Sequence, residues 1–377
     1  MTRDWGDCPP YTAVLIVPTG IGASIGGYAG DALPVARLLA QAVDRLITHP
    51  NVLNGAQLYW PLPNAYYVEG YGLDRFAAGH WGLRPVRQNR VGLLLDCAIE
   101  PELRWRHLQA ANAAKATLGL VLTDYVVTDA PLQVELQTAA SGATWGTLGN
   151  PDSLLRASEK LLRQAKAEAI AVVARFPDDS DSPELQQYRQ GQGVDLLAGA
   201  EAVISHLVVK TFQVPCAHAP ALMPLPLDPT VSPKSAAEEL GYTFLPCVLA
   251  GLSQAPQFAT RAGQLSQAGA NIWADQVDAV IIPADAAGGS GVISLSQRGA
   301  RVIAVEQNQT AMQVKPEAIG MSSVRVSSYL EAAGLLLADR AGVDPTALQS
   351  TIAPLQTLAD KYKPDIIPGL ANSSIRL

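Results

Sequence analysis

Short apolar runs alternate with longer helical patterns along the chain. Several runs are apolar at successive positions, as at 91–95 (VGLLL) and 169–174 (AIAVVA). Strands covered on both faces have this character, whereas a strand with one solvated face alternates apolar and polar residues. The pattern therefore predicts an α/β fold with mostly parallel sheets flanked by helices. The expected strands are 13–17, 91–96, 120–127, 169–174, 279–282, 302–305 and 323–326.

Helix starts are indicated by three Xaa-Pro pairs. A residue with a capping side chain followed by proline is typical of the first helical position, because the missing N–H of proline has no helical partner there. We therefore expect helices to begin at Asn150-Pro151, Ser232-Pro233 and Asp344-Pro345.

Breaks in the pattern suggest the domain organisation. The acidic stretch 177–193 is the expected link between two α/β halves, 1–180 and 190–377, with a crevice between them. Residues 54–85 are rich in aromatic side chains, glycine and proline and are expected to form a covering loop or an oligomer surface. The proline-rich stretch 216–233 is expected to be irregular.

Composition excludes some classes of protein. The net charge of -7 argues against nucleic-acid binding, which depends on clustered Lys and Arg. No apolar stretch approaches the roughly 18 residues of a membrane span, and the N-terminus shows no signal core. The four cysteines form no CxxC pair, which fits a reducing compartment. We expect a cytoplasmic protein that has no membrane partner. These patterns also allow a homo-oligomer.

The second of two glycine-rich turns resembles a dinucleotide-binding turn. Gly288, Gly289 and Gly291 follow an expected strand and precede a helix, and Glu306 ends the next strand. In dinucleotide folds such glycines let backbone N–H groups approach an anion, and an acid about 20 residues later binds a ribose. The spacing departs from GxGxxG, and Asp285 precedes the glycines where it would repel a pyrophosphate. A tight turn without a ligand is the competing interpretation.

The first glycine-rich turn has the glycine density of an anion-binding loop but lacks the Lys-Ser/Thr of a P-loop. Asp31 lies near the expected helix start, where it caps the helix or takes part in catalysis. Arg175 follows another expected strand and would clamp a carboxylate or phosphate if it faced the crevice. The glycines of this turn are Gly20, Gly22, Gly26 and Gly27.

Histidine and cysteine meet in the middle of the chain. Cys216 and His218 are two residues apart, and Glu201 and His206 precede them. A neighbouring imidazole can lower the pKa of a thiol and carry its proton, and the same residue types bind zinc. The spacing matches no zinc signature, and a buried, inert pair is the competing interpretation. His218 and Cys216 are the candidate reactive side chains.

Four segments carry a family resemblance. VPTGIGASIGGYAGD (17–31), AVVARFP (171–177), PCAHAPA (215–221) and TFLPCVLAGLSQAP (243–256) resemble a family of cyanobacterial and plastid proteins, domain of unknown function 3326. The resemblance spans nearly the whole chain and implies one architecture of about this length in a cyanobacterial or chloroplast setting. It implies no catalytic residue and no cofactor.

Three functions follow from these patterns. The first is an enzyme that binds a small anionic metabolite or nucleotide at the glycine-rich turns, with Arg175 as a clamp and with His218 and Cys216 or an aspartate moving protons. The second is a metal-assisted hydrolase or lyase using His206, His218 and a carboxylate. The third is a non-catalytic binding or assembly protein with an aromatic surface at 54–85.

Overall fold

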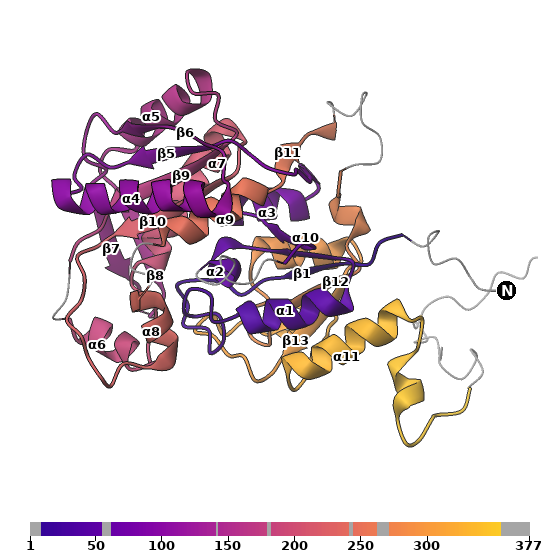
Figure 1. The fold of residues 1–377 in the computed structure, drawn as a ribbon. Coiled ribbons are helices and arrows are strands. Elements are labelled where there is room, and N and C mark those ends of the chain that lie inside the picture. Colours follow the sequence, from indigo (N-terminus) through magenta and orange to yellow (C-terminus); the bar gives the residue numbers. More distant parts are fainter. Residues whose placement is uncertain are drawn as a thin grey trace, which may run out of the picture.

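Two parallel sheets form the centre of the molecule (Figure 1). The structure is a computed structural model, which describes residues 9–54, 62–140, 142–178, 182–240, 244–261 and 271–355. The six-stranded sheet has the order β14-β13-β12-β1-β2-β3, and the four-stranded sheet has the order β10-β9-β5-β6. Neighbouring strands of both sheets run parallel. The predicted α/β class with mostly parallel sheets flanked by helices is confirmed.

The strands are short. Those of the six-stranded sheet are β1 (Thr12–Leu15), β2 (Arg45–Thr48), β3 (Ala65–Tyr67), β12 (Ala279–Pro283), β13 (Arg301–Val305) and β14 (Val324–Val326). Those of the four-stranded sheet are β5 (Val91–Leu95), β6 (Leu122–Val127), β9 (Ala169–Arg175) and β10 (Cys216–Ala221). Two antiparallel pairs join β4 (Gly82–Arg84) to β11 (Gln257–Ala259) and β7 (Val134–Thr138) to β8 (Thr144–Leu148).

Helices cover both faces of each sheet. On the six-stranded sheet, α1 (Leu33–Ala42) and α11 (Tyr329–Arg340) pack on one face, and α3 (Gly70–Ala77) and α10 (Ser290–Gln297) on the other. On the four-stranded sheet, α4 (Pro101–Leu118) and α9 (Leu245–Gln254) oppose α5 (Pro151–Arg163) and α7 (Ala198–Phe212). The remaining helices are α2 (Pro50–Leu53), α6 (Pro183–Arg189), α8 (Pro233–Leu240) and the 3-10 helices Ala274–Gln276, Pro316–Ile319 and Pro345–Leu348.

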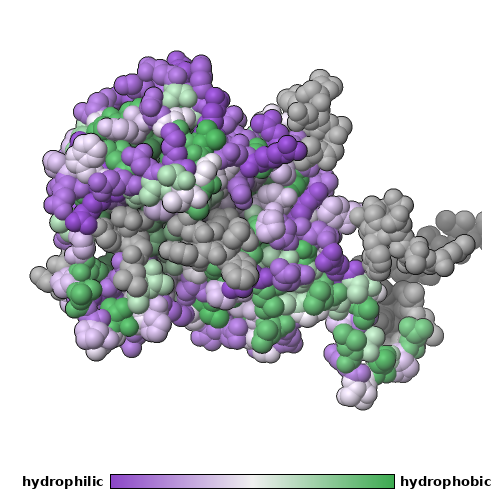
Figure 2. All heavy atoms as spheres, viewed as in Figure 1, coloured by the Kyte–Doolittle hydropathy of each residue, from purple (hydrophilic) through white to green (hydrophobic). Residues whose placement is uncertain are grey.

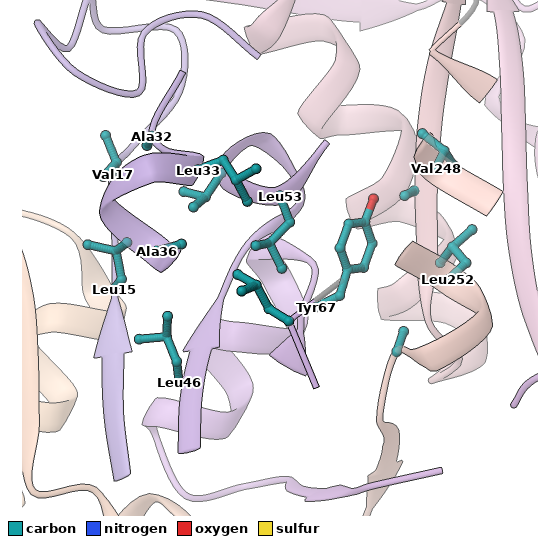
Figure 3. Close-up of a cluster of buried hydrophobic side chains, with 14 of the residues drawn as sticks. Leu15, Val17, Ala32, Leu33, Ala36, Leu46, Leu53, Tyr67, Val248 and Leu252 are labelled. Atoms are coloured by element: carbon teal, nitrogen blue, oxygen red, sulfur yellow. The ribbon is translucent and has the colours of Figure 1, made fainter. Parts of the chain in front are cut away.

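Burial explains why the central strands are apolar at successive positions. Ala13 and Leu15 of β1 face one core cluster, and Val14 between them faces another. The first cluster continues from the six-stranded sheet to α9, where Val248 and Leu252 lie opposite Tyr67 (Figure 3). The two sheets therefore share one hydrophobic core.

The first strands along the chain belong to the six-stranded sheet, the middle ones to the four-stranded sheet, and the last ones to the six-stranded sheet again. Ala13 of β1 pairs with Ala279 of β12 in parallel register. The six-stranded sheet thus takes strands from both ends of the chain, while the strands of the other sheet lie between residues 91 and 221. The division into domains 1–180 and 190–377 stays a prediction, and the two sheets partition the chain differently.

Two segments expected to be irregular are more ordered. In 54–85, the described part contains β3, α3 and β4, and Tyr67, Phe76 and Trp81 are buried. The expected exposed aromatic surface is therefore wrong for these side chains, while Tyr59 and Trp60 lie outside the described residues. The stretch 216–233 begins with β10, an edge strand, where Pro220 costs no sheet hydrogen bond on the open side.

All three Xaa-Pro pairs begin helical turns, as predicted: α5 at Pro151, α8 at Pro233 and a 3-10 helix at Pro345. None of the described helices is both long and apolar enough to cross a bilayer. Figure 2 shows apolar residues gathered near the end of the described chain, where Leu348, Ile352 and Leu355 are exposed.

Candidate functional site

A large cavity lies where the two sheets meet. Its volume is about 1130 Å³, at the upper end of the roughly 300–1,000 Å³ of small-molecule sites. The six-stranded sheet contributes residues that follow β1 and β2, and the four-stranded sheet contributes β10 and its covering helix α7. Carboxyl ends of parallel strands are the usual place for ligands in such folds. Three of the five histidines of the chain line this cavity: His49, His206 and His218.

Glu69 and His206 form the first carboxylate–imidazole pair. Glu69 Oε1 lies 2.6 Å from His206 Nδ1, and Oε2 accepts the backbone N–H of Gly72 as the N-cap of α3. The Glu69 side chain is almost fully buried, whereas that of His206 is 42% exposed. Burial disfavours the imidazolium, but the hydrogen bond and charge of Glu69 outweigh it, so the pKa of His206 is raised. Glu69 therefore favours the charged form of a partly exposed histidine.

Glu201 and His218 form the second pair. His218 Nε2 lies 3.5 Å from Glu201 Oε2, and Nδ1 lies 3.2 Å from Ser205 Oγ. Ser205 Oγ is also 3.5 Å from Glu69 Oε1, so this hydroxyl lies between the two pairs. Glu201 and Ser205 are one turn apart on α7, which places both on the helix face toward β10. A positioned imidazole with a carboxylate behind it is a common arrangement for moving protons.

Two further carboxyl groups, those of Asp195 and Glu238, have raised pKa values. Burial and the neighbouring Glu201 charge raise the pKa of Asp195 to about 7, although its Oδ1 accepts the Leu197 N–H at 2.8 Å. Burial and repulsion from Asp195 also raise the pKa of Glu238, which accepts the Tyr188 hydroxyl at 2.7 Å. Both side chains line the cavity, so its wall holds two carboxyl groups whose pKa values are raised by burial and by neighbouring acidic groups.

His49 is neutral. It follows β2, and its Nε2 accepts the backbone N–H of Val17 at 3.1 Å. Burial lowers its pKa to about 4. An Nε2 that accepts this bond leaves the ring proton on Nδ1. His49 therefore presents an uncharged, hydrogen-bonding ring to the cavity.

The second glycine-rich turn faces the cavity. Gly289 and Gly291 line it, and Gly289 is the N-cap of α10. The N-terminus of α10 meets a carboxylate of the protein itself, because Ser290 Oγ donates to Asp74 Oδ2 at 2.6 Å. Arg298, after the other end of α10, donates to the Ala77 carbonyl at the end of α3. Arg298 thus caps the end of α3, and the Asp74 carboxylate lies beside the N-terminus of α10 through its bond with the Ser290 hydroxyl.

The first glycine-rich turn packs against other parts of the chain. A Cβ at Gly26 would lie 2.6 Å from a methyl group of Val17, and one at Gly22 would lie 3.0 Å from Val194. The Gly20 carbonyl accepts the Thr144 N–H of β8 at 2.9 Å. Thr19 and Pro18 line the cavity, whereas Gly20, Gly22, Gly26 and Gly27 are not among its lining residues.

The other candidate residues lie apart from the cavity lining. Cys216 is fully buried, and burial raises the pKa of its thiol, which opposes a reactive thiolate. Arg175 forms an ion pair with Glu100 at 2.8 Å and another with Asp178. The remaining candidate residues, Gly288, Glu306 and Asp31, also lie outside the cavity lining. Glu306 forms an ion pair with Arg325, and Asp31 forms one with Lys234. Burial raises the pKa of Asp31.

The predicted metal alternative gains no support from the geometry. His206 and His218 each face a carboxylate of their own. Among the residues that the structure describes, no three His, Cys, Asp or Glu side chains converge as a set of metal ligands.

Sequence reasoning found His206, His218 and Glu201 but missed their partners. Glu69, Ser205 and Asp195 carry no motif, and each is a single polar residue in an otherwise ordinary segment. One signal was available for Glu69, since an acid before Gly-Tyr-Gly at a helix start is a capping pattern. Its pairing with a histidine 137 positions later (206 minus 69) is a product of the tertiary fold.

Comparison with known proteins places the chain among uncharacterised relatives. A family model described as "Protein of unknown function (DUF3326)" matches residues 12–349. A protein named as an uncharacterized lipoprotein from Synechococcus sp. is 62% identical over 337 residues, which cover 89% of this chain and 93% of the relative. No solved structure matches. The resemblance stated from the sequence is confirmed, while the relative's name makes a cytoplasmic location a prediction only.

Proposed function

Because this chain belongs to the DUF3326 family, we propose a function from its cavity: it is an enzyme that binds a small molecule between the two sheets and exchanges protons with it through His218. The observation that carries this proposal is the contact of the His218 ring with Glu201 on one nitrogen and Ser205 on the other, inside the cavity. A carboxylate orients the ring and stabilises its charged form, so the imidazole can alternate between base and acid.

The charge of the cavity wall supports a ligand that carries positive charge or several hydrogen-bond donors. The described lining contains eight carboxylic acids and one arginine, Arg189, which is paired with Glu239 at 2.8 Å. Glu69, Asp178 and Glu239 are paired with His206, Arg175 and Arg189, and the raised pKa values of Asp195 and Glu238 favour their neutral forms. The negative charge of the wall therefore rests mainly on Asp74, Glu201 and Asp228, and such charge concentrates ligands of the opposite sign. This proposal departs from the anionic metabolite or nucleotide expected from the glycine-rich turns. The eight acids are Glu69, Asp74, Asp178, Asp195, Glu201, Asp228, Glu238 and Glu239.

The rest of the wall is apolar. The segment 222–227, which follows β10, lines the cavity with leucine, methionine and proline side chains. Such a surface fits the hydrocarbon part of a ligand, because burying apolar area away from water is favourable by about 25 cal/mol per Å². We therefore propose an amine or polyhydroxy compound with an apolar body as the substrate class.

A thermal-shift screen tests the binding step. Alkylamines, aminoalcohols, nucleotides and carboxylic acids are added separately, and the first two classes are expected to raise the melting temperature. Ala202→Leu on α7 fills part of the cavity and should remove the shift, whereas Ala116→Leu on the exposed face of α4 should keep it. Stabilisation by nucleotides or acids alone would contradict the proposed ligand class.

Deuterium exchange tests the chemistry. The compound that binds is incubated with protein in D₂O, and incorporation of deuterium at carbon is followed by mass spectrometry. Loss of a general acid–base group typically costs about 10²–10⁴-fold in rate, so His218→Asn is expected to slow incorporation by that factor while binding persists. Binding without incorporation in the native protein would instead identify a non-catalytic binding protein.

A further inference from the structure

We propose that Ser205 and the Glu69–His206 pair form a proton relay that connects His218 with solvent. The inference rests on the proposed function, since an imidazole that gives a proton to a ligand must recover one before the next turnover. The relay follows from four contacts in sequence: His206 Nδ1 to Glu69 Oε1 at 2.6 Å, Glu69 Oε1 to Ser205 Oγ at 3.5 Å, Ser205 Oγ to His218 Nδ1 at 3.2 Å, and His218 Nε2 to Glu201 Oε2 at 3.5 Å.

The two ends of this chain of contacts differ in exposure. The His206 side chain is 42% exposed, and the His218 side chain is 17% exposed. Between them, Glu69 is 4% and Ser205 is 2% exposed, so water has little access to the middle of the path. All four residues line the cavity, and the path runs from the more exposed imidazole to the less exposed one.

Ser205 is suited to the central position because a hydroxyl donates one hydrogen bond and accepts others. Serine within a helix commonly donates to a carbonyl of the preceding turn, and Ser205 Oγ does lie 3.3 Å from the Ala202 carbonyl. The hydroxyl can therefore rotate among this carbonyl, Glu69 and His218. Because the hydroxyl can rotate, it can donate its proton either toward Glu69 or toward His218.

Each proton in the relay has a defined donor and acceptor. His206 releases its Nδ1 proton to Glu69 Oε1, and the resulting carboxylic acid passes a proton to Ser205 Oγ. Ser205 at the same time gives its own hydroxyl proton to His218 Nδ1, so the serine ends neutral. His206 takes a proton from water on Nε2, because its Nδ1 is buried against Glu69. The net result is one proton moved from solvent to His218, with His206 left as the Nε2–H tautomer until its ring turns and restores the Nδ1 proton.

Other ionisable groups face the two histidines. Asp195 and Glu201 face His218. Asp74 favours the charged form of His206, where the Tyr71 ring lies 6.3 Å from the imidazole ring. The groups that face both ends of the relay are therefore acidic.

The test is the rate at which the His218 ring proton exchanges with water, measured by NMR on ligand-free protein labelled with ¹⁵N-histidine. Ser205→Ala is expected to slow this exchange by about tenfold or more, which corresponds to about 1.4 kcal/mol in the barrier. The same variant should leave exchange at His206 unchanged. Ser205→Thr, which restores a hydroxyl, should return the His218 rate toward the native value.

Ser253→Ala is the matched control. Ser253 is also a buried helical serine, 4% exposed, whose hydroxyl donates to a carbonyl three residues earlier, and it lies on α9. Its replacement should leave exchange at His218 unchanged. Equal exchange in the native protein and in Ser205→Ala would overturn the relay. This result would leave ligand binding and deuterium incorporation untouched, so the two proposals fail separately.

Discussion

The two glycine-rich turns follow adjacent strands, β1 and β12, yet they differ in what approaches the glycines. In the first turn the neighbours are parts of the packed protein, including Val17 and Val194. In the second turn, a Cβ at Gly291 would lie 2.9 Å from Asp74 Oδ1, a carboxylate at the end of a side chain. A glycine in a strand–helix turn thus indicates that another group lies close to the backbone. The sequence does not show whether that group is a side chain, a backbone segment or a ligand.

The largest expected effect is in the first turn. Gly26 has φ of +93°, and its Cβ would overlap the Val17 side chain. A left-handed conformation and overpacking together cost about 2–4 kcal/mol, so Gly26→Ala should lower the free energy of unfolding by this amount. Urea denaturation measures it. Gly119 also has a positive φ, +67°, but a Cβ there would meet nothing within 4 Å, so Gly119→Ala should cost only about 1 kcal/mol; equal losses would refute the role of packing.

A second expected effect concerns the loop against which the first turn packs. Asp195 in this loop has a pKa of about 7 in the fold and about 3.9 when unfolded. Between about pH 4 and pH 7 the folded state holds a proton that the unfolded state has released, so its contribution to stability falls as the pH rises. Asp195→Asn should therefore equal the native protein near pH 4 and exceed it at pH 8 by on the order of 2 kcal/mol.

Denaturation curves at the two pH values measure this difference. Repulsion from Asp195 contributes to the raised pKa of Glu238, so both proteins are compared in a Glu238→Gln background. If native and variant proteins show the same change in stability from pH 4 to pH 8, the carboxyl group of Asp195 is not held in its protonated form.

The smallest expected effect is in the second turn. Asp74→Ala removes the carboxylate that meets the N-terminus of α10, which should cost about 1 kcal/mol. The freed helix end should then bind an external anion, so sulfate should raise the melting temperature of the variant more than that of the native protein. Sulfate stabilises proteins generally, and the native protein supplies this baseline. An equal rise in both would show that the turn does not bind anions.

The sequence predicts the fold well where a strand is covered on both faces. The runs at β1, β5, β9, β12 and β13 are apolar at successive positions, apart from Thr12, Arg175 and Arg301 at strand ends, because helices cover both sides of them. It fails where the local pattern is weak: β3 is only Ala-Tyr-Tyr, and β10 contains a proline that is tolerated because the strand lies at an edge. Such strands form through their neighbours rather than through a local pattern.

The site was less predictable than the fold for the same reason. His218 draws attention as a histidine beside a cysteine, but Cys216 points into the core and is inert. The contacts on which the proposed function rests instead join Glu69 to His206 and Ser205 to His218, across α3, α7 and β10. Residue types reveal candidates, whereas pairing depends on which segments the sheets bring together.

The pairing of β1 with β12 has a consequence for how the protein matures. Ala13 leaves the ribosome long before its partner Ala279 is synthesised. Until then one side of the earliest strand has no neighbour and remains open to other chains. Assembly of the six-stranded sheet must wait until β12 has been synthesised, and nascent polypeptides halted before that point should be the ones that chaperones retain.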